Sequence, residues 1–211
     1  MAWYMQQERQ QTYQKRRKRH CPALLVWLVV IVVLSMIAVL FVVNCHENTA
    51  DRVRQISYPQ KYREYVNKAA NDYRLPPSLI YAVIRTESGF DPEAESPVGA
   101  KGLMQLMPSS FEWVMSLRGE SGKYTEKDLF DPAVNIDYGS YLLRYFYDYY
   151  NEERCAVAAY NAGFVVSEWL SNPNLSFDGV TLTQIPYPET AEYVERVESA
   201  KAVYIELYYS S

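Results

Sequence analysis

The chain has 211 residues, of which 49% are hydrophobic and 22% are charged, and its formal net charge is −4. This apolar content excludes a disordered protein, and eight glycines with 11 prolines exclude collagen-like or low-complexity material. The length is ample for one domain and short for two full ones.

The charge is spread unevenly along the chain. Residues 1–22 carry a net charge of +5, residues 23–43 carry no charge, and residues 46–211 carry a net charge of −9. Because binding to phosphates needs a basic face, the acidic segment argues against a nucleic-acid partner.

The first predicted element is a transmembrane helix over residues 23–43. About 20 uninterrupted apolar residues match the ~30 Å hydrocarbon core at 1.5 Å per residue. The basic run 15–19 lies directly before this stretch, so the positive-inside rule places the tail 1–22 in the cytoplasm and residues 46–211 outside. We therefore expect a single-pass protein of the cell membrane.

A cleaved signal peptide is the alternative for this stretch. Its apolar region would be about 7 to 15 residues long and would end in a small-x-small site. The run 23–43 is longer, and Val42, Val43, Asn44 and Cys45 offer no such site. An uncleaved anchor is therefore favoured.

Cysteine and histidine are sparse in this chain. Cys155 falls in an alanine-rich helical stretch and reads as a small apolar filler, while a disulfide between Cys45 and Cys155 stays open. No group of Cys or His residues has metal-ligand spacing. We expect neither a metal nor another cofactor.

The outer part of the chain is predicted to be a tether over residues 46–59, followed by one domain over residues 60–211. Helix signals dominate this domain, and alternating strand patterns are nearly absent. Proline or Asp-Pro pairs open helices and glycines close them. The expected helical segments are 62–73, 77–88, 132–150, 152–162 and one that starts at 188. The predicted fold class is all-α, with six or seven short helices.

Glu87 is the most informative residue of the second segment. Ile80, Val83 and Ile84 define its buried stripe, and Glu87 continues that stripe at i+7. Burial and a helix C-terminus both raise the pKa of a carboxyl group. A carboxylic acid that is protonated near neutral pH can serve as a general acid. The alternative is a structural ion pair with Arg85 or Lys101.

Four blocks in fixed order give this residue a context. The blocks are Glu87-Ser88-Gly89-Phe90, the segment 96–108 (SPVGAKGLMQLMP), Ala158-Ala159-Tyr160-Asn161-Ala162-Gly163 and Pro188-Glu189-Thr190-Ala191-Glu192-Tyr193. With these blocks the chain resembles the catalytic domain of the soluble lytic transglycosylase family, a lysozyme-like fold, over roughly residues 60–209.

The resemblance implies a reaction on bacterial peptidoglycan. The family cleaves the β-1,4 bond between N-acetylmuramic acid and N-acetylglucosamine without adding water, because the muramyl C6 hydroxyl attacks C1 and leaves a 1,6-anhydro end. Glu87 matches the single catalytic glutamate, which acts first as general acid and then as general base. Most glycosidases need two carboxylates about 5 to 9.5 Å apart, whereas Asp91, Glu93 and Glu95 read as solvated loop charges.

Further residues match substrate-binding positions of the family one by one. Ser96 and Gln105 match positions that line the cleft, with a turn and a helix-surface amide as their alternatives. Tyr160 matches a tyrosine beside the catalytic glutamate, and Asn161 matches a sugar-binding or loop-fixing amide. The last block adds Glu189, which can instead cap its helix, and Tyr193.

Two other functions compete with the lytic transglycosylase. One is a hydrolytic lysozyme of the same fold, which needs a carboxylate placed to activate water. The other is a non-catalytic peptidoglycan-binding scaffold, against which the intact Glu87 argues. Peptidoglycan strands and the membrane are the expected partners, and the sequence names no protein partner.

Overall fold

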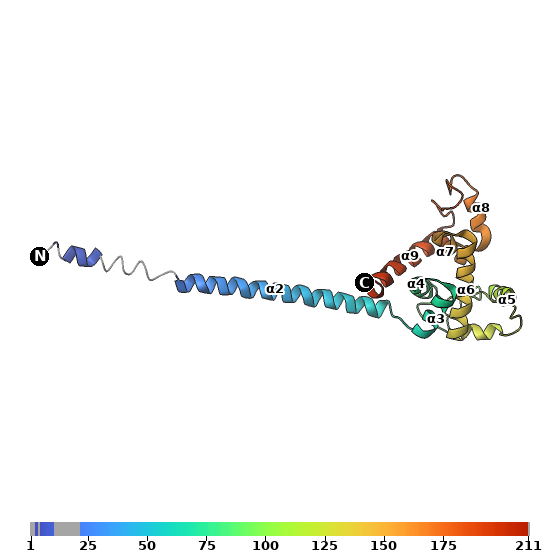
Figure 1. The fold of residues 1–211 in the computed structure, drawn as a ribbon, viewed down its shortest axis with the longest axis horizontal. Coiled ribbons are helices and arrows are strands. Elements are labelled where there is room, and N and C mark those ends of the chain that lie inside the picture. The colour runs from blue at the N-terminus through green and yellow to red at the C-terminus, as the bar shows by residue number, and fades with distance from the viewer. Residues whose placement is uncertain (1–2, 4, 11–21, 211) are drawn as a thin grey trace. The chain divides into compact units, whose positions relative to one another are not determined.

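Figure 1 shows the computed structural model, which describes residues 3, 5–10 and 22–210. The chain divides into two compact units, residues 1–54 and residues 55–211. The basic run 15–19 and Cys21 lie outside the described residues, as do the side chains of residues 22–25 and 43–51, among them Cys45. The topology expected from the basic run therefore stays a prediction.

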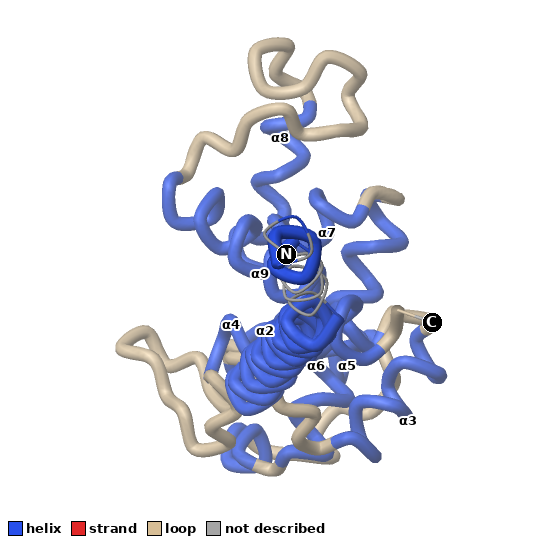
Figure 2. The backbone as a smooth tube through the Cα atoms, turned by 90° about the vertical axis from the view of Figure 1, so that its left-hand side faces the viewer, coloured by secondary structure: helices blue, strands red, loops and turns tan. Residues whose placement is uncertain are grey.

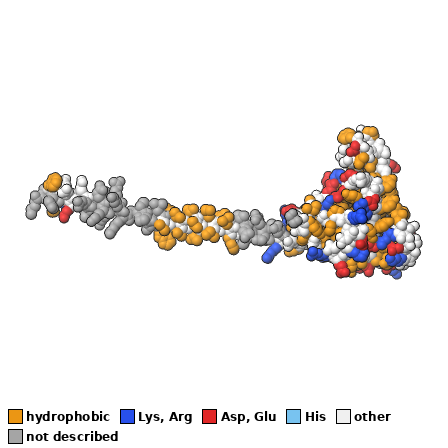
Figure 3. All heavy atoms as spheres, in the orientation of Figure 1, with side chains coloured by type: hydrophobic (Ala, Val, Ile, Leu, Met, Phe, Trp, Pro, Cys, Tyr) orange, Lys and Arg blue, Asp and Glu red, His pale blue; other side chains and the backbone are white. Residues whose placement is uncertain are grey.

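Helix α2 (Pro22–Ser57) contains the apolar stretch and continues through most of the predicted tether. The side chains of residues 26–42 are exposed, and Figure 3 shows them as a run of hydrophobic atoms. Within the described part of the chain, no helix is long and apolar enough to cross a membrane. The predicted transmembrane span is thus not confirmed: the described part of the apolar stretch ends at Val42, and from Arg52 onward α2 carries charged residues.

The second unit is built of helices joined by loops (Figure 2). Over residues 55–210 there are no strands, only isolated bridges that join Lys101 to Glu95 and to Leu106, so the all-α prediction is confirmed. Its elements are α3 (Arg63–Tyr73), α4 (Pro77–Ser88), α5 (Pro108–Leu117), η1 (Glu126–Phe130), α6 (Pro132–Tyr150), α7 (Glu153–Ala162), η2 (Gly163–Val165), α8 (Val166–Leu170) and α9 (Pro188–Tyr208).

The helix ends follow the predicted signals closely. Gly89 ends α4 in the left-handed region, with φ of 60°, and its N–H donates to the Arg85 carbonyl. Asp131 caps α6, because its carboxylate accepts the N–H groups of Ala133 and Val134 at 2.7 and 3.4 Å. Local chemistry therefore sets the length of the helices that carry the site.

Helix α4 lies at the centre of the core. It packs against α9 and α3, while α6 packs against α3 and α7. The predicted stripe of Ile80, Val83 and Ile84 is fully buried, but Tyr81 and Ala82 between them are equally inaccessible. The helix is thus enclosed on all sides over this turn, and its C-terminal turn is the first part to reach the surface.

Tyrosines of α9 hold the segment that precedes α3. The hydroxyl of Tyr208 donates to the Tyr58 carbonyl at 2.8 Å, and the hydroxyl of Tyr204 donates to the Pro59 carbonyl at 3.2 Å. From α4, the Arg85 guanidinium donates to the Ser57 carbonyl and lies over the Tyr58 ring, 3.9 Å from its centroid. Residues 57–59 are therefore fixed to both α4 and α9.

Cys155 lies in α7 as a buried, free thiol. Burial raises the pKa of this thiol to about 12, so it stays protonated at physiological pH. The apolar-filler interpretation fits this position, and the disulfide with Cys45 is not formed.

Candidate active site

Glu87 lies in the last turn of α4, where the helix leaves the core. The preceding turns are fully buried, while the residue itself is partly exposed. The neighbouring Ser88 ties this turn to the following loop, because its hydroxyl contacts the Ile84 and Leu103 carbonyls at 3.2 and 2.8 Å. The carboxyl group is thus carried by a rigid turn at the edge of the core.

The ion-pair alternative for Glu87 is not realised. Lys101 pairs with Glu95, and Arg85 is engaged by the Ser57 carbonyl and the Tyr58 ring. Neither Arg85 nor Lys101 forms an ion pair with the Glu87 carboxyl. Burial is therefore the main influence on the pKa of this group.

Burial raises the pKa of Glu87 from 4.5 to about 7, against smaller lowering effects of the Tyr193 hydroxyl and of the Arg196 charge. A carboxyl group with this pKa is substantially protonated at neutral pH, so it can donate a proton and take one back in the same cycle. The expected pKa shift of Glu87 is therefore present, with desolvation as its main cause.

Two tyrosines share the surroundings of this carboxyl. Burial raises the pKa of Tyr160 and of Tyr193 well above 10, and the charge of Glu87 adds to both shifts. The Tyr160 hydroxyl donates to the Met104 carbonyl at 2.9 Å, so that hydrogen bond takes the place of one to the carboxyl. The Tyr193 hydroxyl is buried and has no hydrogen-bond partner of regular geometry among the described residues.

Asn135 holds the loop between α4 and α5 and had no signal in the sequence. This fully buried side chain accepts the Met104 N–H at 2.7 Å. It donates to the Lys101 carbonyl at 2.9 Å and to the Leu129 carbonyl at 2.8 Å. The Met104 carbonyl in turn accepts the Tyr160 hydroxyl. The side-chain amide of Asn135, on α6, therefore positions the loop that follows the last turn of α4, the turn that carries Glu87. An asparagine inside a helical pattern looks like any polar residue, which is why it was missed.

Two glycines allow this close packing. At Gly102, with φ of +76°, an added Cβ would lie 2.1 Å from the Leu129 carbonyl oxygen and 2.3 Å from Nδ2 of Asn135. At Gly139 an added Cβ would lie 2.6 Å from Sδ of Met104 and 3.1 Å from the Tyr160 hydroxyl. At Gly102 the backbone packs too closely against Leu129 and Asn135 to admit a side chain. Gly99 has φ of +89° and open space around it, so this glycine serves only the conformation of the turn.

Ser96 and Gln105 both lie in this loop and both bind its backbone. The Ser96 hydroxyl accepts the Ala100 N–H at 3.0 Å, which is the turn role. Gln105 is not on a helix surface as its alternative supposed: it has φ of +48°, and its amide donates to the Ala94 and Gly102 carbonyls at 3.1 and 2.9 Å. The Gln105 amide therefore holds the loop together by its NH2 group.

Asn161 and Glu189 lie where α7 and α9 meet. Asn161 is exposed, and its Oδ1 accepts the Thr190 hydroxyl at 2.7 Å, which links the third block to the fourth. Glu189 is exposed in the first turn of α9, whose N-cap residue Tyr187 makes no side-chain cap. The acids of the nearby loop, Asp91, Glu93 and Glu95, are exposed as predicted. Among the described residues, no group of three His, Cys, Asp or Glu could hold a metal ion.

The arrangement supplies one partly buried acid, two phenols beside it and a loop whose half-buried amide and hydroxyl groups bond to the loop backbone. Such a set can protonate a leaving oxygen and hydrogen-bond to a polar chain, and it offers no second carboxylate as shielded as Glu87.

Known proteins are similar to this chain in sequence. Residues 64–175 match the family model described as the transglycosylase SLT domain. The chain is 35% identical over 150 residues to the soluble lytic murein transglycosylase of Escherichia coli, covering 70% of this chain and 23% of that protein. A membrane-bound lytic murein transglycosylase C of Actinobacillus succinogenes is 44% identical over 85 residues, covering 39% of this chain and 24% of that protein.

The chain is also similar in fold to solved structures of lytic transglycosylases. The 70 kDa soluble lytic transglycosylase of Escherichia coli aligns with a TM-score of 0.65 and 30% identity over 72% of this chain and 25% of that one. An inactive glutamate-to-glutamine mutant of the lytic transglycosylase Slt of Pseudomonas aeruginosa aligns with a TM-score of 0.62 and 33% identity, over the same shares of both chains. The chain thus spans about a quarter of the length of these relatives.

Proposed function

The chain belongs to the transglycosylase SLT domain family, and from that premise we propose that it is a peptidoglycan lytic transglycosylase. Its substrate is the β-1,4 bond between N-acetylmuramic acid and N-acetylglucosamine, and its product is a 1,6-anhydromuramyl end. The names of the soluble and membrane-bound murein transglycosylases among its relatives support this proposal.

Glu87 performs both proton transfers of the proposed reaction. Its protonated carboxyl donates to the glycosidic oxygen as the C1–O4 bond breaks, so that N-acetylglucosamine leaves with a free 4-hydroxyl. The carboxylate that remains takes the proton of the muramyl C6 hydroxyl, whose oxygen forms the new bond to C1. The carboxyl group ends the cycle protonated again, and no water is consumed.

One observation carries this mechanism: the pKa of Glu87 is raised by burial to about 7, without an ion-pair partner in Arg85 or Lys101. A group with such a pKa can act as acid and base at neutral pH. Because the nucleophile belongs to the substrate, a second buried carboxylate is not required. Activity is expected to fall as the pH rises above about 7, since Glu87 then loses the proton it must donate.

The substrate-binding set is the one expected from the sequence. Ser96 and Gln105 present the loop between α4 and α5 to the glycan, and Asn161 and Glu189 present the junction of α7 and α9. Tyr160 and Tyr193 lie beside the carboxyl, whose pKa is raised by burial and lowered in part by the Tyr193 hydroxyl. Support comes from the exposure of Asn161 and Glu189 and from the shared electrostatic surroundings of both phenols with Glu87.

Glu87→Gln tests the proposal, because glutamine has nearly the same shape and cannot exchange the proton. The full-length variant should lose at least about a hundredfold in the rate of release of muropeptides from peptidoglycan, measured by chromatography and mass spectrometry. Glu93→Gln, a change of an exposed acid in the neighbouring loop, should keep the wild-type rate. An inactive Glu87→Gln variant and anhydro ends from the wild type are the expected outcome.

Two results would contradict the proposal in different ways. Wild-type products that end in reducing muramic acid, one water heavier, would identify a hydrolytic lysozyme. Full activity of Glu87→Gln would remove this glutamate from the mechanism.

The proposal also places the enzyme at the cell membrane, with residues 1–22 in the cytoplasm and the helical domain outside. The uncharged stretch 23–43 and the basic run before it support this placement. The exposed apolar side chains of residues 26–42 and the similarity to a membrane-bound lytic murein transglycosylase C are consistent with it.

A further inference from the structure

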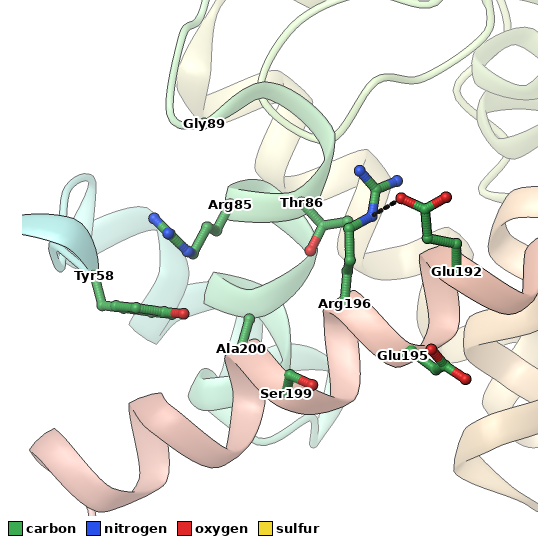
Figure 4. Close-up of a pocket in the computed structure, with 9 residues that line it drawn as sticks. All are labelled: Tyr58, Arg85, Thr86, Gly89, Glu192, Glu195, Arg196, Ser199 and Ala200. Atoms are coloured by element: carbon green, nitrogen blue, oxygen red, sulfur yellow. Dashed lines mark ion pairs between the residues drawn. The ribbon is translucent and has the colours of Figure 1, made fainter. Parts of the chain in front are cut away.

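A pocket on the surface of α6 is lined mostly by tyrosines. Its volume is about 310 Å³, and it lies between the end of α3 and the second half of α6. The pocket between α4 and α9 in Figure 4 borders the turn that carries Glu87 and belongs to the proposed site. The pocket on α6 shares no residue with it, and its lining consists of Tyr73, Tyr141, Arg144, Tyr145, Asp148 and Tyr149.

This α6 pocket lies on the side of the helix that faces away from the proposed site. Gly139 marks the side that faces the site, because an added Cβ there would meet Met104 and the Tyr160 hydroxyl. Asp148 follows Gly139 on the same helix by about two and a half turns. Tyr141 and other residues of the lining share the side of Asp148. The pocket and the surroundings of Glu87 are therefore separated by the body of α6.

The aromatic rings of the α6 pocket are held by other rings of the protein. Tyr145 meets Trp113 with ring centroids 4.9 Å apart and an angle of 79° between the planes. Tyr149 meets Phe164 at 5.5 Å and 77°, yet it is 56% exposed. These edge-to-face contacts fix the rings and leave ring surface open to solvent. Rings that are already fixed lose little conformational entropy when a ligand stacks on them.

The polar groups of the α6 pocket suit a ligand without charge. Arg144 and Asp148 form an ion pair with each other, one turn apart, so the two charges of the lining compensate. In the part of the chain that the structure describes, no residue hydrogen-bonds to the hydroxyls of Tyr141, Tyr145 or Tyr149. Each of these phenols can therefore both donate to a ligand and accept from it.

A chain of amino sugars has the matching chemistry. The C–H face of a pyranose ring stacks on an aromatic ring, while its hydroxyl and acetamide groups hydrogen-bond to phenols and to an Arg–Asp pair. An anionic lipid surface fits less well, because the pocket has no excess of positive charge and residues 46–211 carry a net −9.

We propose that the α6 pocket is a second glycan-binding site, which holds an uncleaved stretch of a peptidoglycan strand by stacking sugars on Tyr145 and Tyr149. The inference rests on the proposed function for the identity of the glycan, but this second site takes no part in the cleavage. Its consequence is avidity: the enzyme stays on the cell wall between two cuts, because one contact remains when the site at Glu87 releases its product.

Retention on insoluble peptidoglycan tests the second site. The full-length Glu87→Gln protein in detergent should sediment with isolated sacculi, and Tyr149→Ala in the same background should weaken this binding by about tenfold. Tyr149→Phe, which keeps the ring, should retain most of the affinity. Tyr209→Ala is the control and should bind as the Glu87→Gln protein does, because Tyr209 is an exposed tyrosine directly after α9 and outside the pocket.

Rates of cleavage separate the second site from the proposed reaction. With Glu87 intact, Tyr149→Ala should digest sacculi several-fold more slowly at low substrate concentration. It should cleave a soluble fragment of two disaccharide units at the wild-type rate, which also shows that the variant folds.

Three outcomes would decide between the alternatives. Sedimentation that ignores Tyr149→Ala would overturn the second site, and equal losses on sacculi and on the soluble fragment would assign Tyr149 to the site at Glu87 instead. Sedimentation that depends on Tyr149, in a protein whose wild type cleaves neither substrate, would retain the second site and reject the transglycosylase.

Discussion

The buried carboxyl of Glu87 links chemistry to stability. Its pKa lies at about 7 in the folded protein and at 4.5 when the group is free in water. Between these two pH values the unfolded chain releases a proton that the folded chain keeps. The contribution of Glu87 to the free energy of unfolding is therefore greatest below about pH 4.5, falls as the pH rises to about 7, and changes no further above that pH.

Glu87→Gln should consequently stabilise the protein in alkaline solution. At pH 8 the gain in free energy of unfolding should reach about 3 kcal/mol, because glutamine removes the charge that burial disfavours. At pH 4 the variant and the wild type should unfold alike, since both are then neutral at this position. Urea unfolding at the two pH values measures this difference.

The exposed Glu93→Gln serves as the control, with no gain at either pH. A Glu87→Gln variant that is less stable than the wild type at pH 8 would mean that the carboxylate is stabilised in the fold, and with it the argument for a general acid would fail.

At the scale of residues, the sequence singles out a candidate site residue where a polar side chain interrupts an apolar helical stripe. Glu87 continues an apolar stripe, and that conflict is visible without a structure. Asn135 agrees with a helical pattern, and its contacts lie on other elements, at residues 101, 104 and 129. Its role comes from tertiary packing alone.

At the scale of elements, the loop between α4 and α5 depends on the absence of a side chain at Gly102. An alanine there would place its Cβ 2.1 Å from a backbone oxygen in a conformation with φ of +76°. Gly102→Ala should therefore cost about 3 kcal/mol or more of folding stability, because the clash and the strain add.

Gly99→Ala is the matched comparison in the same loop. It has φ of +89° but nothing within 4 Å of the added Cβ, so it should cost only the conformational strain of about 1 to 2 kcal/mol. Thermal unfolding of the two variants measures the difference. Equal midpoints would show that the loop yields to the added methyl group and does not hold the catalytic turn rigidly.

The elements that could be predicted are those with chemical signals at their ends. Asp131 begins a helix by capping, Gly89 ends one in the left-handed conformation and Gly163 ends one with φ of 74° and ψ of −154°, and the long helices have clear periodicity. The short elements α5, η1 and α8 were not anticipated: the last two are only five residues long, too short to show a period, and α5 follows directly on the loop motif. The helical state of residues 46–57 was also missed, because their polar composition resembles that of a linker.

On the scale of the whole molecule, the charge differs between the N-terminal segment, which is proposed to attach the protein to the membrane, and the helical domain that carries the proposed site. The acidic domain carries a net −9 and the N-terminal tail carries +5. An acidic domain is repelled by anionic lipid headgroups, so under the proposed anchoring the apolar stretch 23–43 holds it near the membrane.

Replacing Leu34 and Ile37 by arginine should release the full-length protein from membranes. Each charge at the centre of an apolar helix costs about 3 kcal/mol in the bilayer. The wild type should stay in the membrane pellet after alkaline carbonate washing, and the double variant should move to the supernatant. Val53→Arg, an exposed position of α2 outside the apolar stretch, should behave as the wild type does. A wild-type protein that is itself extracted by carbonate would refute the anchor.

The contacts at residues 57–59 have a mechanical consequence. Arg85, two residues before Glu87, grips the Ser57 carbonyl, while Tyr204 and Tyr208 grip the next two carbonyls from α9. A tensile load that enters the domain through this segment passes directly to the helix with the catalytic carboxyl and to the helix with Arg196. Tension applied at residues 57–59 would therefore act on α4 and α9 through three hydrogen bonds, and it would change the geometry of the proposed site between these helices.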